Sequence, residues 1–349
     1  VILVEGEFGE SVTVEADDAG LLIVGDHDAS IGSITVNATD VTIQKVSVGT
    51  IEANGDRRTL RESEVSQMTI AAADAVIVRN GLSNVGIVSG ADDTELQHNQ
   101  IGSLGLNLAS GVNIRHNVIS GGSGLTVQAA SSGQTIANQI DGAPVGLSVS
   151  AVFDGLIADN DIQGQAIGVQ YDARAALSGN RISSSPTGVV ATVTDLASAF
   201  GFVEQTEPNE VFGNTVGIEL TGRMQGQWVR NNVTGVVGTG ILGGDHFADP
   251  NRIENNSSGV DFEGEVRYNR IGYNDVGVIA KPGQLIAHNL FYRNETVAIQ
   301  VDAVDDVRIV GNTSYAPTGD NVRITGASKR TEIWNNVLWA ESGYDIYVD

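Results

Sequence analysis

The sequence predicts an all-β protein, a right-handed parallel β-helix of roughly 16 or 17 coils, each with three short strands and stacked about 4.8 Å from the next. Three observations support this fold. Short runs rich in Val, Ile and Thr are separated by Gly, Asp, Asn and Ser. Asparagines recur mostly every 18 to 24 residues, and glycines recur in step with them. No stretch shows a convincing helical period.

The first 75 residues carry short strand-like runs. These runs are SVTVEA, LLIVGD, SITVNA, VTIQKV and QMTIAA. Each predicts a strand of about five residues followed by a turn. They fit the first coils of a β-stack.

From residue 80 the asparagine repeat becomes explicit, and each repeat asparagine precedes an x-Ile/Val/Leu step. The series is Asn80, Asn99, Asn117, Asn138, Asn160, Asn180, Asn214, Asn232, Asn269, Asn289, Asn312 and Asn336, with Asn255 or Asn256 filling the one gap. Asparagine suits a tight turn, and stacked amides can bond the backbone of the next coil. A leucine-rich repeat has a similar period, but it requires leucine at fixed positions and a helical side. Neither is present.

A glycine series starts the strand that follows. It comprises Gly86, Gly105, Gly124, Gly146, Gly168, Gly188, Gly217, Gly240, Gly259 and Gly277. Because side chains alternate across a strand, the residues one and three places after each glycine should point into the core. That inward set is apolar: Leu125, Val127, Leu147, Val149, Val169, Ile218, Leu220, Val260, Phe262, Val278, Ile299 and Val301.

These coils resemble the secreted β-helix repeat proteins of the pectate-lyase-like superfamily. The resemblance runs from VNIRHNVISGGSGLTV to AIQVDAVDDVRIVGNTSYAPTGDNVRI and covers nearly the whole chain. It implies a secreted or cell-surface carbohydrate-active protein, with its site on the face of the strand that begins each coil. The superfamily includes lyases, glycoside hydrolases, epimerases and phage tailspikes, and no lyase or polygalacturonase signature stands in this sequence.

Composition limits the partners. The 349 residues carry a formal charge of −24, which disfavours nucleic acid because the long-range field would repel it. No apolar run approaches the roughly 20 residues of a membrane span, so no membrane insertion is expected. The chain contains no cysteine, so it forms no disulfides.

We expect residues 1–349 to form one domain. The chain opens in VILVEG and closes in YDIYVD, which suggests a module cut from a longer precursor. Long turns at about 193–211 and 243–252 interrupt the repeat, and both are expected to leave after the glycine-led strand. Two long turns at one corner should form the wall of a groove.

Charge gathers on the outward face of the glycine-led strands, in the second half of the chain. The candidate catalytic residues are Lys281, Arg323 and Asp261, with Lys281 or Arg323 as base or as neutraliser of a uronate carboxylate. Asp261, Glu263 and Glu219 are candidate oxygen ligands for Ca²⁺. The candidate substrate-binding residues are Asp172, Glu219, His246, Phe247, Gln300 and Asp302.

The alternative for this patch is structural. Glu263, Lys281 and Asp302 would then form a ladder of surface ion pairs, which contributes about 1 kcal/mol or less. For function, the first expectation is a lyase that cleaves an acidic polysaccharide by β-elimination, with Ca²⁺ as a possible cofactor. Glu219 and Asp261, two coils apart, leave an inverting glycoside hydrolase open. A non-catalytic glycan-binding adhesin or surface spike is the third alternative.

Overall fold

The fold is an all-β solenoid. The computed structural model describes residues 1–26 and 28–349, which are 58% strand and 1% helix. Parallel strands stack as a β-solenoid of about 16 turns, which confirms the predicted fold class. The chain forms two compact units: unit 1 is Val1–Gln165 with Ala173–Ala176, and unit 2 is Ala166–Asp172 with Leu177–Asp349.

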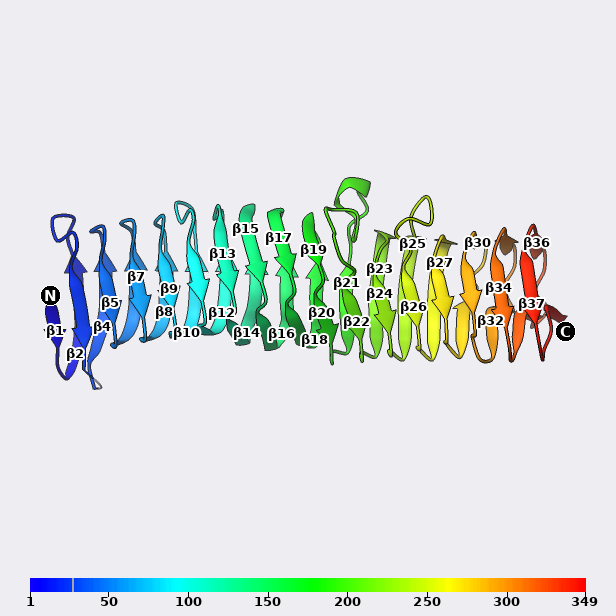
Figure 1. The fold of residues 1–349 in the computed structure, drawn as a ribbon, viewed down its shortest axis with the longest axis horizontal. Helices are drawn as coiled ribbons and strands as arrows, with labels where there is room; N and C mark the ends of the chain where they lie inside the picture. Colours follow the sequence, from blue (N-terminus) through cyan, green and yellow to red (C-terminus); the bar gives the residue numbers. More distant parts are fainter. Residues whose placement is uncertain (27) are drawn as a thin grey trace. The chain divides into compact units, whose positions relative to one another are not determined.

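The strands of unit 1 alternate between two parallel sheets (Figure 1). The first contains β1 (Ile2–Val4), β3 (Leu22–Gly25), β5 (Thr42–Gln44), β7 (Thr59–Arg61), β9 (Val76–Val78), β11 (Glu95–Gln97), β13 (Val112–Arg115), β15 (Ser131–Ile136) and β17 (Phe153–Ala158). The second contains β2 (Glu7–Val14), β4 (Ser30–Val36), β6 (Ser47–Ala53), β8 (Glu64–Ile70), β10 (Gly81–Ile87), β12 (Gln100–Leu106), β14 (Val118–Val127) and β16 (Gln139–Val149). In unit 1, two of the three strands predicted for each coil are joined into one longer strand.

Unit 2 has a set of short step strands and a set of glycine-led strands. The step strands are β20 (Arg181–Ser183), β22 (Glu210–Phe212), β24 (Trp228–Arg230), β26 (Arg252–Glu254), β28 (Arg270–Gly272), β31 (Leu290–Tyr292), β34 (Thr313–Ala316) and β37 (Val337–Ala340). The glycine-led strands are β21 (Thr187–Ala191), β23 (Val216–Met224), β25 (Thr234–Leu242), β27 (Ser258–Arg267), β29 (Val276–Ile279), β32 (Val297–Asp302), β35 (Asp320–Thr325) and β38 (Ile346–Val348).

The third side of unit 2 is formed by short strands or by the ends of long ones. Separate strands on this side are β30 (Leu285–Ala287), β33 (Arg308–Val310) and β36 (Glu332–Trp334), which stack on the end of β27. The predicted three strands per coil therefore hold from β28 onward. β18 (Asp161–Tyr171) and β19 (Ala175–Ser178) contain residues of both units, and the 3₁₀ turn η1 (Leu196–Ser198) lies in a loop.

The core is the apolar lumen of the coils. All twelve side chains of the predicted inward set are buried, with at most 1% exposure. The alternation that predicted them is therefore confirmed.

Two asparagine ladders, rather than one, stabilise the turns of unit 2. The first ladder runs through Asn180, Asn209, Gln227, Asn251, Asn269, Asn289, Asn312 and Asn336. The second runs through Ser185, Asn214, Asn232, Asn256, Asn274 and Asn294. In the second ladder the Asn232 backbone N–H and side-chain amide both donate to Asn256 Oδ1, at 2.9 and 3.1 Å.

The single predicted series is therefore wrong in unit 2. It joined Asn214, Asn232 and Asn256 of the second ladder to members of the first. Both corners require a buried amide, because each leaves backbone N–H and C=O groups without a strand partner.

The glycine series is also wrong at two places. Gly105 pairs with Thr126, and Gly124 pairs with Ser103, so Gly86 and Gly105 do not align with the later glycines. Gly235, not Gly240, leads β25, since its strand register aligns Val216, Thr234 and Ser258. Gly240 lies further along the same strand and pairs with Gly222 and Gly264. The turn 243–252 consequently leaves from the third side, after Leu242, and not directly after the glycine-led segment.

Arg58 interrupts the apolar interior of unit 1. The residue is 5% exposed, and one guanidinium nitrogen donates to Val36 O at 3.2 Å. Its Nε and Nη1 atoms have no hydrogen-bond partner within residues 1–26 and 28–349. Burial lowers the pKa of Arg58 to about 10.

Replacing Arg58 by Met is expected to stabilise unit 1 by about 1 to 3 kcal/mol, because an apolar side chain avoids burying unpaired donors. Urea denaturation measures the change. Arg57→Met is the control, because Arg57 is exposed and pairs with Asp40 at 2.7 Å. We expect it to change the stability by about 1 kcal/mol or less. A loss of stability in Arg58→Met would contradict this prediction.

Candidate functional site

The predicted outward column of the glycine-led strands exists. Glu219, Val237 and Asp261 are successive register partners, so Glu219 and Asp261 lie two coils apart as expected. The column continues through Ile279, Gln300 and Arg323. Val237 and Ile279 make it apolar on either side of Asp261.

Lys281 lies against Asp261. Its ammonium forms an ion pair with Asp261 Oδ1, and the two side chains are 28% and 36% exposed. The Lys281 backbone N–H donates to Gln284 Oε1 at 2.9 Å, and the buried Gln284 side chain donates to Phe262 O at 2.6 Å. Lys281 is thus held at the start of the turn that follows β29, with its charge at the surface.

The other predicted residues of this face have separate partners. Arg323 forms an ion pair with the buried Asp320 at 2.8 Å. Asp302 accepts a hydrogen bond from Thr325 Oγ1 at 2.7 Å. Asp172 accepts from Gln170 Nε2 at 2.7 Å, and also from the Thr192 hydroxyl. The predicted ion-pair ladder of Glu263, Lys281 and Asp302 does not form, because Lys281 pairs with Asp261 instead.

The predicted calcium ligands lie on two strands, Glu219 on β23 and both Asp261 and Glu263 on β27. Ca²⁺ requires several oxygens around one point. The Val237 row separates Glu219 from Asp261, and the Lys281 ammonium already contacts Asp261. Among the residues that the structure describes, no group of three His, Asp or Glu side chains could hold a metal. Binding of Ca²⁺ by Asp261, Glu263 and Glu219 stays a prediction.

In the loop at 243–252, His246 and Phe247 each have their own contacts. Phe247 contacts the Tyr268 ring edge-on at 6.0 Å, and Tyr268 stacks on His288 at 5.1 Å. His246 Nδ1 accepts a hydrogen bond from the Ala248 backbone at 3.3 Å. Both side chains therefore have contacts within the loop and its neighbouring coils.

Asp245 connects the same loop to the coils beneath it. Its Oδ1 accepts from Arg223 at 2.8 Å and from Arg267 at 2.9 Å. The hydrogen bond from Arg223, together with the charges of Arg223 and Arg267, lowers the pKa of Asp245. The loop, which follows β25, is consequently tied to the coil before its own and to the coil after it.

A cleft lies between the two long loops of unit 2. Both loops project from one edge of this unit in Figure 1. The cleft has a volume of about 510 Å³. Its lining comes from the first loop, the turn before β24, the second loop and the starts of two step strands: Gly201, Phe202, Glu204, Gln205, Thr206, Glu207, Pro208, Gln225, Gly226, Ala248, Asp249, Pro250, Arg252 and Arg270. We call it the loop cleft; Asp261 and Lys281 are not in its lining.

The first ladder anchors one wall of the loop cleft. Gln227 occupies a ladder position where the other members of unit 2 are asparagines, and its longer side chain reaches the first loop. Gln227 Nε2 donates to Gln205 Oε1 and to Gln225 O, both at 2.7 Å, while Gln205 Nε2 donates to Gly226 O at 2.7 Å. Phe200 is 1% exposed and packs on Tyr171. The wall is therefore built on the core.

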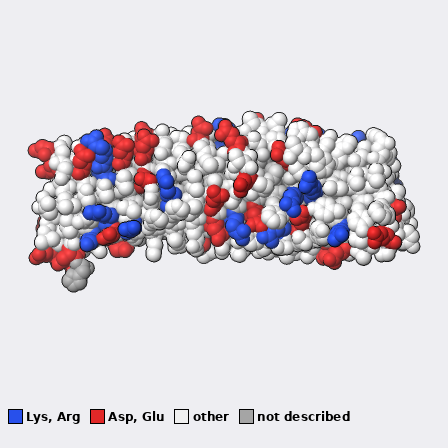
Figure 2. All heavy atoms as spheres, viewed as in Figure 1, with Lys and Arg blue, Asp and Glu red and all other residues white. Residues whose placement is uncertain are grey.

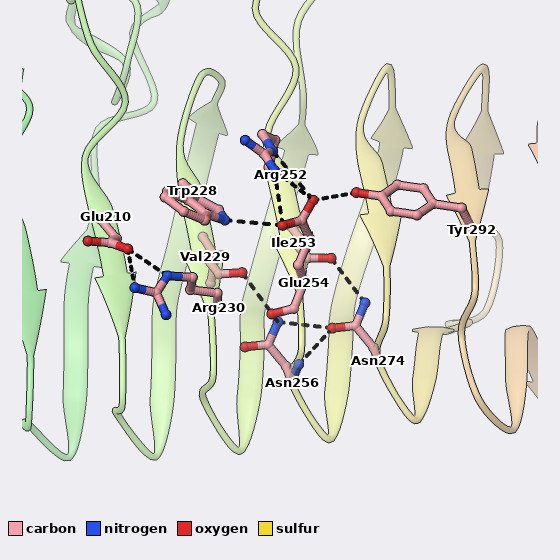
Figure 3. A network of polar contacts seen from close by, with 10 residues as sticks. All are labelled: Glu210, Trp228, Val229, Arg230, Arg252, Ile253, Glu254, Asn256, Asn274 and Tyr292. Carbon is pink, nitrogen blue, oxygen red and sulfur yellow. Dashed lines mark hydrogen bonds and ion pairs between the residues drawn. The ribbon is translucent and has the colours of Figure 1, made fainter.

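A second network, missed by the sequence analysis, lies on the step strands. Glu254 is 6% exposed and accepts from three side chains on different coils (Figure 3). The donors are the Trp228 indole at 3.3 Å, the Arg252 guanidinium at 3.2 Å and the Tyr292 hydroxyl. Burial and the hydrogen bond to Glu254 raise the pKa of Tyr292.

Arginines and aromatic rings alternate along this face. Arg230 lies 4.9 Å from the Trp228 ring and Arg252 lies 5.0 Å from the same ring. Arg181 and Arg230 share Glu210, and basic and acidic side chains adjoin each other across unit 2 in the same view (Figure 2). The sequence segments WVRNN, RIENN and LFYRN indicate this network, because the first and third residues of each segment face outward.

Comparison with family models, with curated proteins and with solved structures finds no match to this chain. Within the described residues, no helix has the length and apolar character required to cross a membrane.

Proposed function

We propose that this protein is a secreted or cell-surface carbohydrate-active module of the pectate-lyase-like type, and that it binds an acidic polysaccharide in the loop cleft. The observation that supports this most is the cleft itself. Its volume of about 510 Å³ is within the range of roughly 300 to 1,000 Å³ typical of small-molecule sites. Both long loops of unit 2 form it.

The lining suits a sugar. Glutamine and carboxylate side chains can exchange hydrogen bonds with hydroxyl groups, and Phe202 offers an apolar face to a sugar ring. Arg252 and Arg270 supply positive charge in a protein whose net charge is −24.

For chemistry, we propose β-elimination on the glycine-led face. The observation in its favour is the Lys281 ammonium, which is partly exposed beside Asp261. In this reaction a base, for which Arg323 is the candidate, takes the proton next to a uronate carboxylate, the glycosidic C–O bond breaks, and the leaving oxygen takes a proton. Lys281 would neutralise the charge that develops on the carboxylate, with Arg323 further along the same face. Calcium dependence stays a prediction for the assay.

A screen of acidic and neutral polysaccharides, with and without Ca²⁺, tests this function. Binding by calorimetry shows whether the protein takes a glycan at all. Ultraviolet absorbance of an unsaturated uronate product identifies a lyase, whereas new reducing ends without that absorbance identify the hydrolase that Glu219 and Asp261 would support. Binding without either product would indicate the non-catalytic glycan-binding adhesin. No binding to any glycan would overturn the proposal.

Lys281→Ala is expected to reduce the lyase rate by at least about a hundredfold, because loss of one electrostatic stabiliser in a site costs that much. The melting temperature should hardly change, since a surface ion pair contributes little stability. Lys329→Ala controls for the loss of a surface charge, because Lys329 is an exposed lysine whose side chain has no ion pair within the described residues. Full activity in Lys281→Ala would remove Lys281 from the mechanism.

A further inference from the structure

We infer that Arg252 and Arg270 form a subsite for the carboxylate of an acidic sugar in the loop cleft, and that Glu254 positions Arg252. The inference rests on the proposed function and specifies which residues would select the charged form of the ligand. Both arginines line the cleft.

The two arginines are direct neighbours on adjacent coils. Arg252 of β26 and Arg270 of β28 are register partners. Neighbouring strands lie about 4.8 Å apart, and like charges directly opposite each other are destabilising. The Arg270 guanidinium has no hydrogen bond or ion pair with any other residue of the described ranges, and it is exposed. An anion between the two side chains would relieve their repulsion.

Arg252 is held in place before any ligand arrives. Trp228 lies 5.0 Å from its guanidinium carbon, and Glu254 accepts from its Nε and Nη2 atoms at 3.2 to 3.4 Å. Nη1 has no partner among the described residues, so this edge of the guanidinium is free. A planar guanidinium with one edge fixed and one edge free is suited to a carboxylate.

Glu254 is itself fixed from a third coil. Tyr292 reaches it across Gly272, which lies between them in the stack. An added Cβ at Gly272 would lie 2.4 Å from the Tyr292 ring. The absence of a side chain at residue 272 therefore lets the tyrosine lie over the strand and donate to Glu254.

The rest of the lining argues for a sugar acid rather than a simple anion. Glu204, Glu207 and Asp249 also line the cleft, and their carboxylates form no ion pair in the described chain. They would repel a bare phosphate or sulfate, but they can accept hydrogen bonds from hydroxyl groups. A uronate unit presents one carboxylate together with several hydroxyls, so it matches both parts of the lining.

The test measures the dissociation constants of galacturonate, mannuronate and guluronate tetramers, each beside its methyl ester. The ester keeps the hydroxyls and loses the charge. Wild-type protein should bind at least one acid form about tenfold or more tightly than its ester, and Arg270→Gln should remove that preference while leaving ester binding unchanged. Arg308→Gln is the matched control, because Arg308 is an exposed arginine of β33 without a side-chain partner in the described ranges; we expect no change.

Tyr292→Phe tests the positioning role. It removes one donor to Glu254 and no group in the cleft lining, so the acid-to-ester preference should fall severalfold with ester binding unchanged. If the wild type, Arg270→Gln and Tyr292→Phe show the same preference for the acid over the ester, the subsite is overturned. If only neutral oligosaccharides bind, the subsite is wrong and the sugar-binding cleft stands; if no glycan binds, both proposals fail.

Discussion

Asn256→Ala is expected to lower the free energy of unfolding of unit 2 by about 3 to 5 kcal/mol. The Asn256 amide donates to Asn274 Oδ1, Glu254 O and Val229 O, and its Oδ1 accepts from both nitrogens of Asn232. The substitution removes all five bonds, of which those to Val229 and Asn274 are drawn in Figure 3. It leaves the Asn232 backbone N–H and the Val229 carbonyl buried without these partners, which costs about 1 to 3 kcal/mol for each group.

Urea denaturation measures this loss, and hydrogen exchange at the Asn232 amide locates it. Ser257→Ala is the control, because Ser257 is the exposed neighbour of Asn256 and its side chain has no hydrogen bond within the described ranges. Its effect should stay within about 0.5 kcal/mol. Equal stability of the two variants would show that the second ladder contributes nothing.

Gly240→Ala should destabilise unit 2 by roughly 3 kcal/mol or more. Gly240 has φ of +124°, a conformation that L side chains rarely adopt, and an added Cβ would lie 2.1 Å from Gly222 O. The neighbouring strand cannot move away without breaking its register with β25. Thermal or urea unfolding measures the change.

Gly213→Ala separates the two causes of that loss. Gly213 also has positive φ, at +67°, but nothing lies within 4 Å of its added Cβ. The expected cost is about 1 kcal/mol, from the left-handed backbone alone. If the two alanine variants lose equal stability, close packing of the strands at Gly240 plays no part.

The fold was predictable because each coil repeats the same physical requirements. Alternating apolar residues identified the lumen, as the burial of Phe262 and Val301 shows. The coil corners were harder to assign. Asn209 and Asn214, like Asn251 and Asn256, are five residues apart and serve two different corners of one coil. The repeat spacing alone cannot distinguish two asparagines whose side-chain amides both bond the backbone at a corner of the coil.

The candidate site was less predictable because its contacts cross several coils. Tyr292 and Glu254 are 38 residues apart in the chain and meet only because Gly272 leaves room between them. Arg252 and Arg270 become neighbours through strand register. By contrast, the pairing of Lys281 with Asp261 joins two residues that the sequence had placed on one outward face. The position of Lys281 on the outward face predicted that it lies near several carboxylates, but not which of them it pairs with.

The ladders also bear on how such a chain can change length during evolution. A coil that begins and ends on ladder asparagines, such as Asn251 to Asn269 with its 18-residue period, offers the same amide at both of its boundaries. A genetic deletion or duplication of that segment would leave a ladder asparagine on each side of the new junction. The same side-chain amide hydrogen bonds could then form there. Gln227 is the exception, because its amide is committed to the loop of Gln205. Insertions and deletions of whole coils should therefore be tolerated C-terminal to Asn289 and selected against around Gln227.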